Sequence, residues 1–385
     1  MGLKSIISKL LGGDSTSNQC TVSSSVTEAT YQVLKKQLRL PKETPSRNGK
    51  TRELSPHTVI VQRYQPYTLL PKRGNNPFST IAETLWVTAG RNDLESLNAH
   101  WLPRSFEYSD DWNSLTKQGT WRAGYGPRIR SFKCRDGTML DQLDLCLHRL
   151  RKQSDTRQAL ITISDPSDDK IESSKDYPCN LVVQFLIRDG CLNTHVYLRS
   201  NDIIFGFCIN SFEWMFISKY LSDQLGLRMG KYHHTSSSLH LYENHYDKAQ
   251  AIVDNYIQVP LFKECRSELH LINPKEFKTL CDDAFTNGGK YILPDSTPEM
   301  ILNFSKALYS ENALTSGDIG VYIDLVTDIT DYNLVLSLLE YGQRKVKTNC
   351  IYTNPILKDK LPSDIYVQTV STLMKFARLY SDPSK

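Results

Sequence analysis

The chain has 385 residues, of which 46 are basic and 42 acidic, and a formal net charge of +4 at pH 7. This near balance gives no electrostatic basis for binding duplex DNA, so any cationic site has to be local. No apolar run is long enough to cross a bilayer, and the nine cysteines contain no C-x-x-C pair, which argues against a membrane span, a zinc site and a disulfide framework. We therefore expect a cytoplasmic protein that binds neither nucleic acid nor membrane and needs no metal.

The N-terminal stretch 1–25 is expected to form a flexible segment. Met1–Leu11 carries apolar residues at helical spacing between lysines, which is typical of a short amphipathic helix, and the stretch 12–25 is rich in Gly, Ser and Thr. We favour a frayed helix followed by a flexible linker, and an anchor for a membrane or a partner is the alternative.

The rest of the chain alternates between helix and strand patterns, which predicts an α/β or α+β fold. Beyond about residue 287, three further helical patterns predict an appended, mostly helical module that ends at residue 385. The expected helices are Val26–Leu40, Phe78–Thr88, Met139–Lys152 and Asn210–Leu225, and the expected strands are Thr58–Arg63, Leu181–Ile187, Cys191–Leu198 and Glu268–Ile272.

A short hairpin is the most informative local feature. The Asp189-Gly190 pair between two strand patterns is a hairpin signal, so the start of the first strand should lie beside the end of the second. Cys179, held by the preceding proline, and Arg199 are therefore predicted to face one site. The cationic side chain should lower the pKa of the thiol and make it a better nucleophile.

These residues resemble the thymidylate synthase family, which includes the pyrimidine nucleotide hydroxymethylases. The resemblance implies a layered α+β fold over residues 26–286, with a mixed twisted sheet flanked by helices, followed by the C-terminal helical extension at 287–385. The gapless part of the match comprises Pro178-Cys179, Gln184-Phe185, Arg199–Asp202, Gly206, Asn210 and His240–His245, and fainter agreement is found at Arg47–Gly49, Glu83–Trp86, Gly124–Arg130 and Asp155–Arg157.

The resemblance implies covalent catalysis, in which the Cys179 thiolate attacks C6 of a pyrimidine nucleotide and makes C5 a nucleophile. Glu83 and Tyr125 match the positions that organise the water network removing the C5 proton. The neighbours of Glu83 on its helix are apolar, so burial should raise its pKa and suit it to proton transfer. Asp202 matches a catalytic acid that also contacts the pterin of the co-substrate, 5,10-methylenetetrahydrofolate. Trp101 matches a tryptophan that packs on the same ring.

Nucleotide binding is also implied by the resemblance. Asn210 would read the base and favours uracil, because the family pairs asparagine with uracil and aspartate with cytosine; a helix-capping role is the alternative. Arg157 would reach into the partner subunit, which implies a homodimer. The implied phosphate ligands are Arg47, Arg157, Arg199 and Ser200, and the implied sugar ligands are His240 and Tyr242.

Three departures from the family pattern leave the reaction open. Asn180 stands where the family has a histidine, Gln158 stands where it has a second arginine, and residues 287–385 replace a short apolar C-terminus. Thymidylate-synthase-like methylation of dUMP is the first prediction. Hydroxymethylation of dUMP, dCMP or CMP is one alternative, and a nucleotide-binding regulatory protein without turnover is the other.

Overall fold

The computed structural model describes residues 19–64, 66, 68, 70, 72–73, 77–94, 105–116 and 118–256. The predicted N-terminal helix, the strand at 268–272 and the C-terminal helical module lie outside these ranges. The boundary between the two predicted domains therefore stays a prediction.

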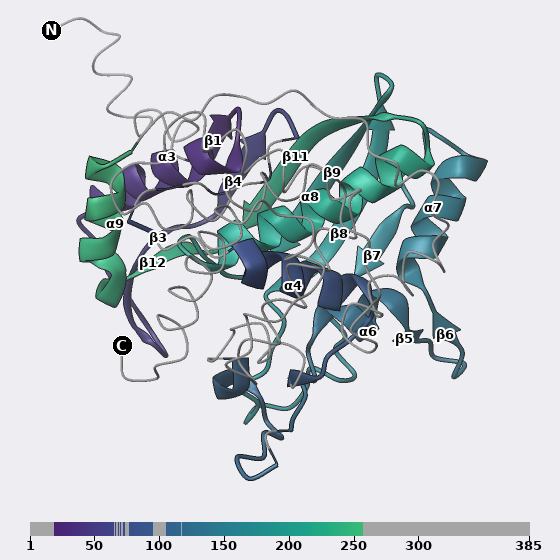
Figure 1. The fold of residues 1–385 in the computed structure, drawn as a ribbon, viewed down its shortest axis with the longest axis horizontal. Helices are drawn as coiled ribbons and strands as arrows, with labels where there is room; N and C mark the ends of the chain where they lie inside the picture. Colours follow the sequence, from purple (N-terminus) through teal and green to yellow (C-terminus); the bar gives the residue numbers. More distant parts are fainter. Residues whose placement is uncertain are drawn as a thin grey trace, which may run out of the picture.

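A six-stranded mixed sheet forms the centre of the described fold (Figure 1). The β1/β4 and β9/β11 pairs are parallel and the other neighbours are antiparallel, as the resemblance implied. The order across this sheet is β1 (Cys20–Ser23), β4 (His57–Val61), β11 (Arg228–Ser236), β9 (Cys191–Leu198), β8 (Asn180–Arg188) and β7 (Leu160–Thr162).

Two smaller sheets complete the strands of the described ranges. In the four-stranded sheet, Asp202 pairs with His240, which brings two of the predicted site segments together. This sheet runs β10 (Asn201–Asp202), β12 (Leu239–Tyr242), β3 (Gly49–Leu54) and β2 (Thr44–Ser46), and the two-stranded sheet consists of β5 (Phe132–Lys133) and β6 (Met139–Leu140).

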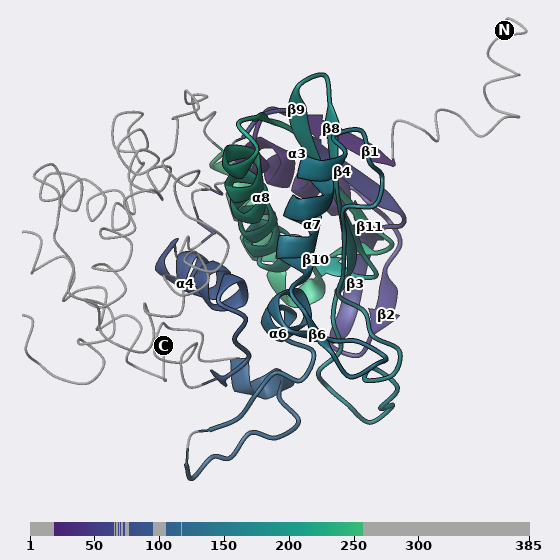
Figure 2. The ribbon, with the colours of Figure 1, turned by 90° about the vertical axis from the view of Figure 1, so that its right-hand side faces the viewer.

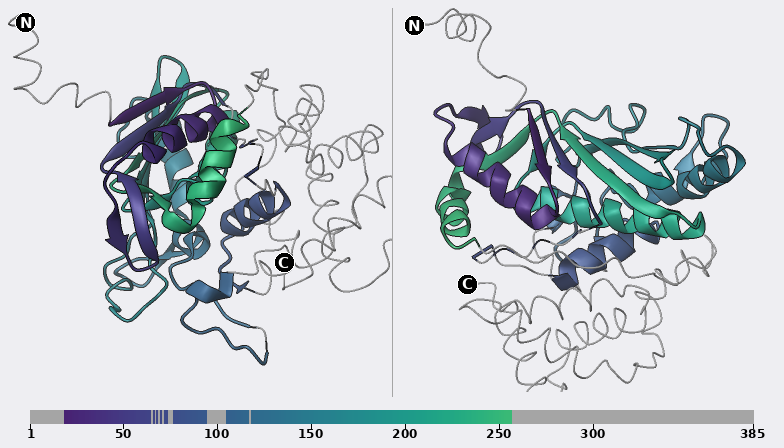
Figure 3. Two further views of the ribbon diagram at one scale, coloured as in Figure 1. Left: turned by 90° about the vertical axis from the view of Figure 1, so that its left-hand side faces the viewer. Right: turned by 90° about the horizontal axis from the view of Figure 1, so that it is seen from above.

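Helices pack on one face of the large sheet (Figure 2). They are α3 (Val26–Leu38), α7 (Gln142–Lys152) and α8 (Gly206–Gln224), and α9 (Tyr246–Asp254) lies beside α3 (Figure 3). The helices α4 (Pro77–Thr88) and α6 (Tyr125–Arg130) contact each other, and α4 also contacts α8. Two 3-10 turns, Ser105–Tyr108 and Glu243–His245, complete the described helical elements.

The alternation along β9 shows how the sheet is oriented. Its even-numbered residues from Leu192 to Leu198 are buried, and the odd-numbered ones are half-buried or exposed, with Tyr197 39% exposed. Strand side chains alternate between the two faces, so one face meets the helices and the other presents Asn193, His195 and Tyr197. No helix of the described ranges covers this second face in Figure 2.

The structure corrects the prediction of a flexible segment up to residue 25. Cys20–Ser23 forms the edge strand β1, and Ser25 caps α3 by accepting a hydrogen bond from the Glu28 amide at 3.1 Å. Glu28 in turn accepts from the amide of Ser24, the residue before the cap, at 3.0 Å, so the first turn of the helix is held from both sides of Ser25. The serines that suggested a linker are the start signal of a helix.

Within the described residues the other predicted elements are found, the strand Cys191–Leu198 with the predicted ends and the rest with shifted ends. Met139 and Leu140 belong to strand β6, and the next helix starts only after Asp141, whose side chain accepts from the amides of residues 143 and 144. The helix expected from Asn210 begins one turn earlier, at Gly206, because Asp202 caps the preceding turn.

Candidate active site

The hairpin places the predicted nucleophile beside an arginine. Asn180 pairs with Leu198 at the open end of β8 and β9, and the Arg199 amide donates to the Cys179 carbonyl at 3.0 Å. The Arg199 Nη2 lies 3.8 Å from Cys179 Sγ. The predicted proximity of Cys179 and Arg199 is confirmed, and their roles stay predictions.

Backbone carbonyls hold the Arg199 guanidinium in place. Its Nε donates to the Pro178 carbonyl at 2.9 Å and its Nη2 to the Tyr177 carbonyl at 3.1 Å, and the guanidinium lies 4.9 Å from the centre of the Tyr177 ring. The side chain nevertheless remains exposed. It is therefore a fixed cation at the surface of the site, suited to an anionic ligand.

The pKa of the thiol differs from the expectation. Burial raises the pKa of Cys179, and the charges of Arg199 and Arg47 act in the opposite direction without overcoming it. The sequence pattern identified the cation correctly, but it could not show how strongly the thiol is desolvated. The prediction of a lowered pKa is wrong for the protein without its substrate, so the thiol has to lose a proton when it attacks.

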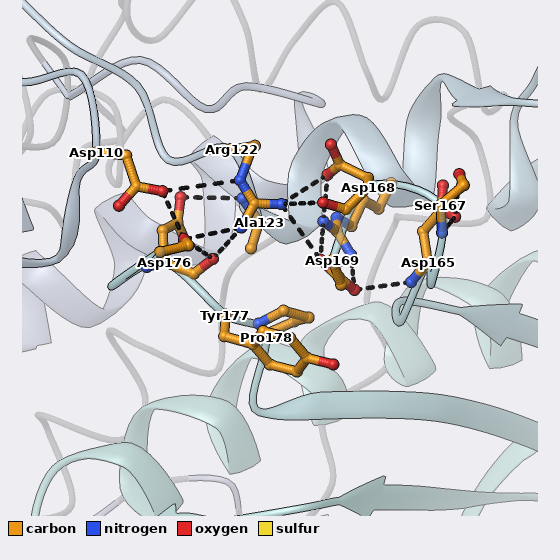
Figure 4. Close-up of polar contacts among 12 residues, drawn as sticks. Asp110, Arg122, Ala123, Asp165, Ser167, Asp168, Asp169, Asp176, Tyr177 and Pro178 are labelled. Carbon is orange, nitrogen blue, oxygen red and sulfur yellow. Dashed lines mark hydrogen bonds and ion pairs between the residues drawn. The ribbon is translucent and has the colours of Figure 1, made fainter. Parts of the chain in front are cut away.

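A network of arginines and aspartates anchors the loop that leads to Cys179 (Figure 4). Arg128 donates to Asp169 at 2.6 Å and to Asp168 at 2.7 Å, and Arg122 donates to Asp168 at 3.0 Å and to the Asp176 carbonyl. The Asp176 carboxylate also accepts from a backbone amide next to Arg122, at 3.0 Å. We call these five residues the arginine–aspartate network.

The buried position of its charges determines how firmly this network holds the loop. The side chain of Asp169 is 0% exposed and that of Arg128 is 7% exposed. Burial acts to raise the pKa of Asp169, but hydrogen bonds and charge from Arg128 outweigh it and leave that pKa lowered. Two buried opposite charges with several hydrogen bonds fix the loop, and each depends strongly on the other.

Glu83 and Tyr125 come from α4 and α6, two helices that contact each other. Glu83 is half-buried on α4, and burial raises the pKa of its carboxyl to about 7, as predicted. The Tyr125 hydroxyl accepts from the Asn180 amide at 3.3 Å, which places it next to Cys179. Burial raises the pKa of Tyr125, and the charges of Cys179 and Glu213 add to this effect.

The four-stranded sheet carries the residues predicted to hold the sugar. The rings of His240 and Tyr242 meet edge to face with their centres 4.8 Å apart, and Asp202 pairs with His240 across the strands. Burial raises the pKa of Tyr242, and the charges of Asp202 and Cys179 contribute in the same direction. These side chains therefore share one electrostatic environment with the nucleophile.

Hydrogen bonds within the described residues orient the side chains of Asn210 and Asp202. The Asn201 side chain donates to Asn210 Oδ1 at 2.9 Å, which fixes how the Asn210 amide is oriented. Asp202 Oδ2 accepts from the Phe205 and Gly206 amides, whereas its Oδ1 is buried and has no hydrogen-bond partner among the described residues. An unsatisfied carboxylate oxygen of this kind suits the N–H groups of a pterin.

One predicted residue, Arg157, lies away from the nucleophile in the described part of one chain. The Arg157 carbonyl accepts from Gln184 at 2.9 Å, and its exposed side chain lines an open hollow of about 580 Å³ near Ile187 and Arg188, at the opposite end of β8 from Cys179. Ser200 is half-buried next to Arg199. Trp101 lies outside the described residues.

Two features of the site were missed from the sequence. Glu213 is 0% exposed on α8, and the charges of Glu213 and Glu83 influence each other. The signal was an acidic residue within the strongly apolar run at 210–225. The arginine–aspartate network gave no local signal, because its partners lie far apart in the sequence.

The described residues contain no cluster of metal-ligating side chains and no helix that could span a membrane. No group of three or more His, Cys, Asp or Glu side chains in these ranges could hold a metal ion. Across the same ranges, no helix combines the length and the apolar character that crossing a membrane requires.

The sequence is similar to those of known proteins. The family model described as thymidylate synthase matches residues 31–280. The chain is 33% identical over 211 residues to a deoxyuridylate hydroxymethyltransferase of Bacillus phage SP01, covering 52% of each protein. It is 32% identical over 237 residues to a protein of the same name from Pseudomonas phage M6, covering 60% of this chain and 63% of the relative.

A third relative with this name, from Delftia phage PhiW-14, is 31% identical over 192 residues, covering 47% of this chain and 50% of the relative. The chain therefore spans between 50% and 63% of the length of these relatives. The family model covers well over half of the chain, and its range includes the hairpin, the four-stranded sheet and α8. On this evidence the chain belongs to the thymidylate synthase family.

Proposed function

We propose that the protein transfers a one-carbon unit from 5,10-methylenetetrahydrofolate to C5 of dUMP, and that the product is the 5-hydroxymethyl nucleotide. The observation that carries the proposal is the thiol of Cys179 next to a fixed guanidinium, with Tyr125 hydrogen-bonded to the following residue and linked to Glu83 through the charge of Glu213. A purely nucleotide-binding protein would need the cation but not the thiol and the proton-transfer groups.

In the proposed reaction the sulfur of Cys179 adds to C6 of the uracil ring, and the electron pair of the C5–C6 double bond moves towards C4 and O4. C5 then acts as the nucleophile towards the one-carbon unit that the folate supplies. Glu83, with a pKa of about 7, is ionised about half the time at neutral pH and can accept the C5 proton through water. Arg199 and Arg47 hold the 5′-phosphate.

Uracil suits the Asn210 side chain better than cytosine does. Because Asn201 donates to Oδ1 of Asn210, the amide nitrogen is the group left to donate to the base. The O4 atom of uracil accepts such a hydrogen bond, whereas the 4-amino group of cytosine is a donor and would repel it. The relatives' names, which specify deoxyuridylate, support the same choice.

The hydroxymethyl product is preferred over the methyl product that the sequence first suggested. All three relatives are named as hydroxymethyltransferases. Formation of a methyl group needs a site that excludes water after the one-carbon unit has been transferred, and in the family a short apolar C-terminus provides this closure. This chain has residues 287–385 in that place.

A direct test follows tritium release from [5-³H]dUMP in the presence of methylenetetrahydrofolate. We expect release from dUMP in preference to dCMP, UMP and CMP, without formation of dihydrofolate, and no release by the variant Cys179→Ala. The matched control Cys191→Ala, at the other end of the hairpin, should retain activity. Dihydrofolate formation would indicate methylation instead, and dUMP binding without any release would indicate a binding protein.

We further propose a homodimer in which Arg157 binds the phosphate in the partner's site. The exposed position of Arg157 away from Cys179 and the sheet face left uncovered by the described helices support this arrangement. Neither Arg157→Ala nor Cys179→Ala alone should be active. A refolded equal mixture is expected to regain about a quarter of the wild-type activity, because one site of each heterodimer is intact. An inactive mixture would contradict the exchange of Arg157.

A further inference from the structure

Glu213 is a buried acidic residue that has no role in the reaction as proposed above. It lies one helical turn after Asn210 on α8, so both side chains project from the same side of the helix. Its side chain is 0% exposed, and neither carboxyl oxygen has a hydrogen-bond partner within the described ranges. The Asn210 side chain interacts with the carboxyl without reaching good hydrogen-bond geometry. A buried, unsatisfied carboxyl group of this kind requires an explanation.

The neighbours of Glu213 come from four different elements of the site. Burial raises the pKa of its carboxyl well above the usual value, and the charge of Glu83 on α4 raises it further. Its own charge contributes to the raised pKa of Tyr125 on α6 and of Tyr232 on β11. Glu213 therefore interacts both with the residue proposed to read the base and with the residues proposed to handle protons.

Two buried carboxyl groups that interact in this way do not both ionise at neutral pH. Glu83 has the lower pKa, about 7, and is the group that can act as a base. Glu213 keeps its proton and can act as an acid. When two neighbouring carboxyl groups have clearly different pKa values, the one with the lower pKa commonly acts as the base and the other as the acid.

The chemistry proposed above creates a need for an acid at O4. When sulfur adds to C6, negative charge develops on O4, and a buried oxyanion requires a donor. Asn180, which stands where the family pattern has a histidine, is 0% exposed and is an amide that cannot transfer a proton. The amide of Asn210 can donate a hydrogen bond to O4, but it cannot transfer a proton either.

We propose, on the basis of the function proposed above, that Glu213 binds O4 of the uracil ring as a carboxylic acid and transfers its proton to O4 when Cys179 adds to C6. In this step the Cys179 thiol gives its proton to water as the S–C6 bond forms, the C5–C6 double bond becomes a C4–C5 double bond, and O4 becomes a hydroxyl while Glu213 becomes a carboxylate. When C5 then bonds to the one-carbon unit, the C4=O4 bond reforms and the proton returns to Glu213. Glu213 thus replaces the missing titratable group next to the base.

Two variants separate proton transfer from contact with O4. Glu213→Gln keeps the shape and a hydrogen-bond donor but cannot transfer a proton, so tritium release from [5-³H]dUMP should fall by about 10²-fold or more, with dUMP binding changed by less than about threefold. Glu213→Met removes the donor. It should weaken binding of dUMP but leave binding of the analogue without O4, pyrimidin-2-one deoxyribonucleoside monophosphate, unchanged.

Asp223→Asn is the matched control, because it makes the same acid-to-amide change on α8, near the far end of the helix. It should leave both tritium release and binding at wild-type values. Near-wild-type release by Glu213→Gln, or equal weakening of dUMP and analogue binding by Glu213→Met, would overturn the assignment, as would an equal loss in Asp223→Asn. If the wild-type protein releases no tritium, the proposed reaction fails, while the comparison of dUMP with the analogue still decides whether Glu213 contacts O4.

Discussion

Replacing Arg128 with methionine is expected to lower the free energy of unfolding by about 3–5 kcal/mol, the usual effect of removing one partner of a buried ion pair. The variant would leave the Asp169 carboxylate, 0% exposed, with the longer contact to Arg122, at 3.4 Å, in place of its close hydrogen bonds to Arg128. The loop before Cys179 would lose its anchor at the same time. We therefore expect tritium release to fall together with the midpoint of chemical denaturation.

The double variant Arg128→Met/Asp169→Asn tests whether this effect comes from the ion pair. The double variant should lose less free energy of unfolding than the two single variants lose together, because removing both charges leaves neither partner of the pair buried without its counterion. The control Arg151→Met, an exposed arginine that donates to Gln224, should change the unfolding free energy by no more than about 0.5 kcal/mol. If the double variant lost as much unfolding free energy as the two single variants together, the effect would not come from the Arg128–Asp169 ion pair.

Replacing Glu83 with glutamine is expected to reduce tritium release by about 10²- to 10⁴-fold, because the amide cannot accept the C5 proton. Burial raises the pKa of Glu83 to about 7, and only the ionised carboxylate is a base. The wild-type rate should therefore rise as the pH increases through about 7 and level off above it.

The pH dependence distinguishes a base from a structural residue. In Glu83→Gln the remaining activity should no longer show the step near pH 7, and the surface control Glu172→Gln should keep both the rate and the step. A wild-type rate that does not change between pH 6 and 8, or a Glu83→Gln variant that retains the step, would show that another group removes the proton.

The parts of the site that depend on neighbouring residues were predictable from the sequence. The Asp189-Gly190 turn and the alternating strands on either side of it fix the pairing of β8 with β9, so the meeting of Cys179 with Arg199 followed from local rules. The apolar neighbours of Glu83 on its helix also predicted its raised pKa. Both predictions needed only periodicity and turn chemistry.

Features that depend on tertiary packing were not predictable in this way. The serines before α3 look like a linker until Cys20–Ser23 pairs with β4, a strand that follows only after α3, β2 and β3. The cationic partner of Cys179 was found, but the degree of burial that outweighs it comes from the folded site as a whole. Glu213 was missed because its significance arises from Glu83 and Tyr125, which lie on other helices.

The central claim is that the sulfur of Cys179 bonds to C6 of dUMP and that the adduct then accepts a one-carbon unit. Peptide mass spectrometry after incubation with 5-fluoro-dUMP and methylenetetrahydrofolate tests it most directly, because fluorine at C5 cannot leave as a proton does and the covalent complex accumulates. We predict that the peptide containing Cys179 carries the mass of both the nucleotide and the folate. An unmodified Cys179 peptide, or the same added mass on a different cysteine, would contradict the claim.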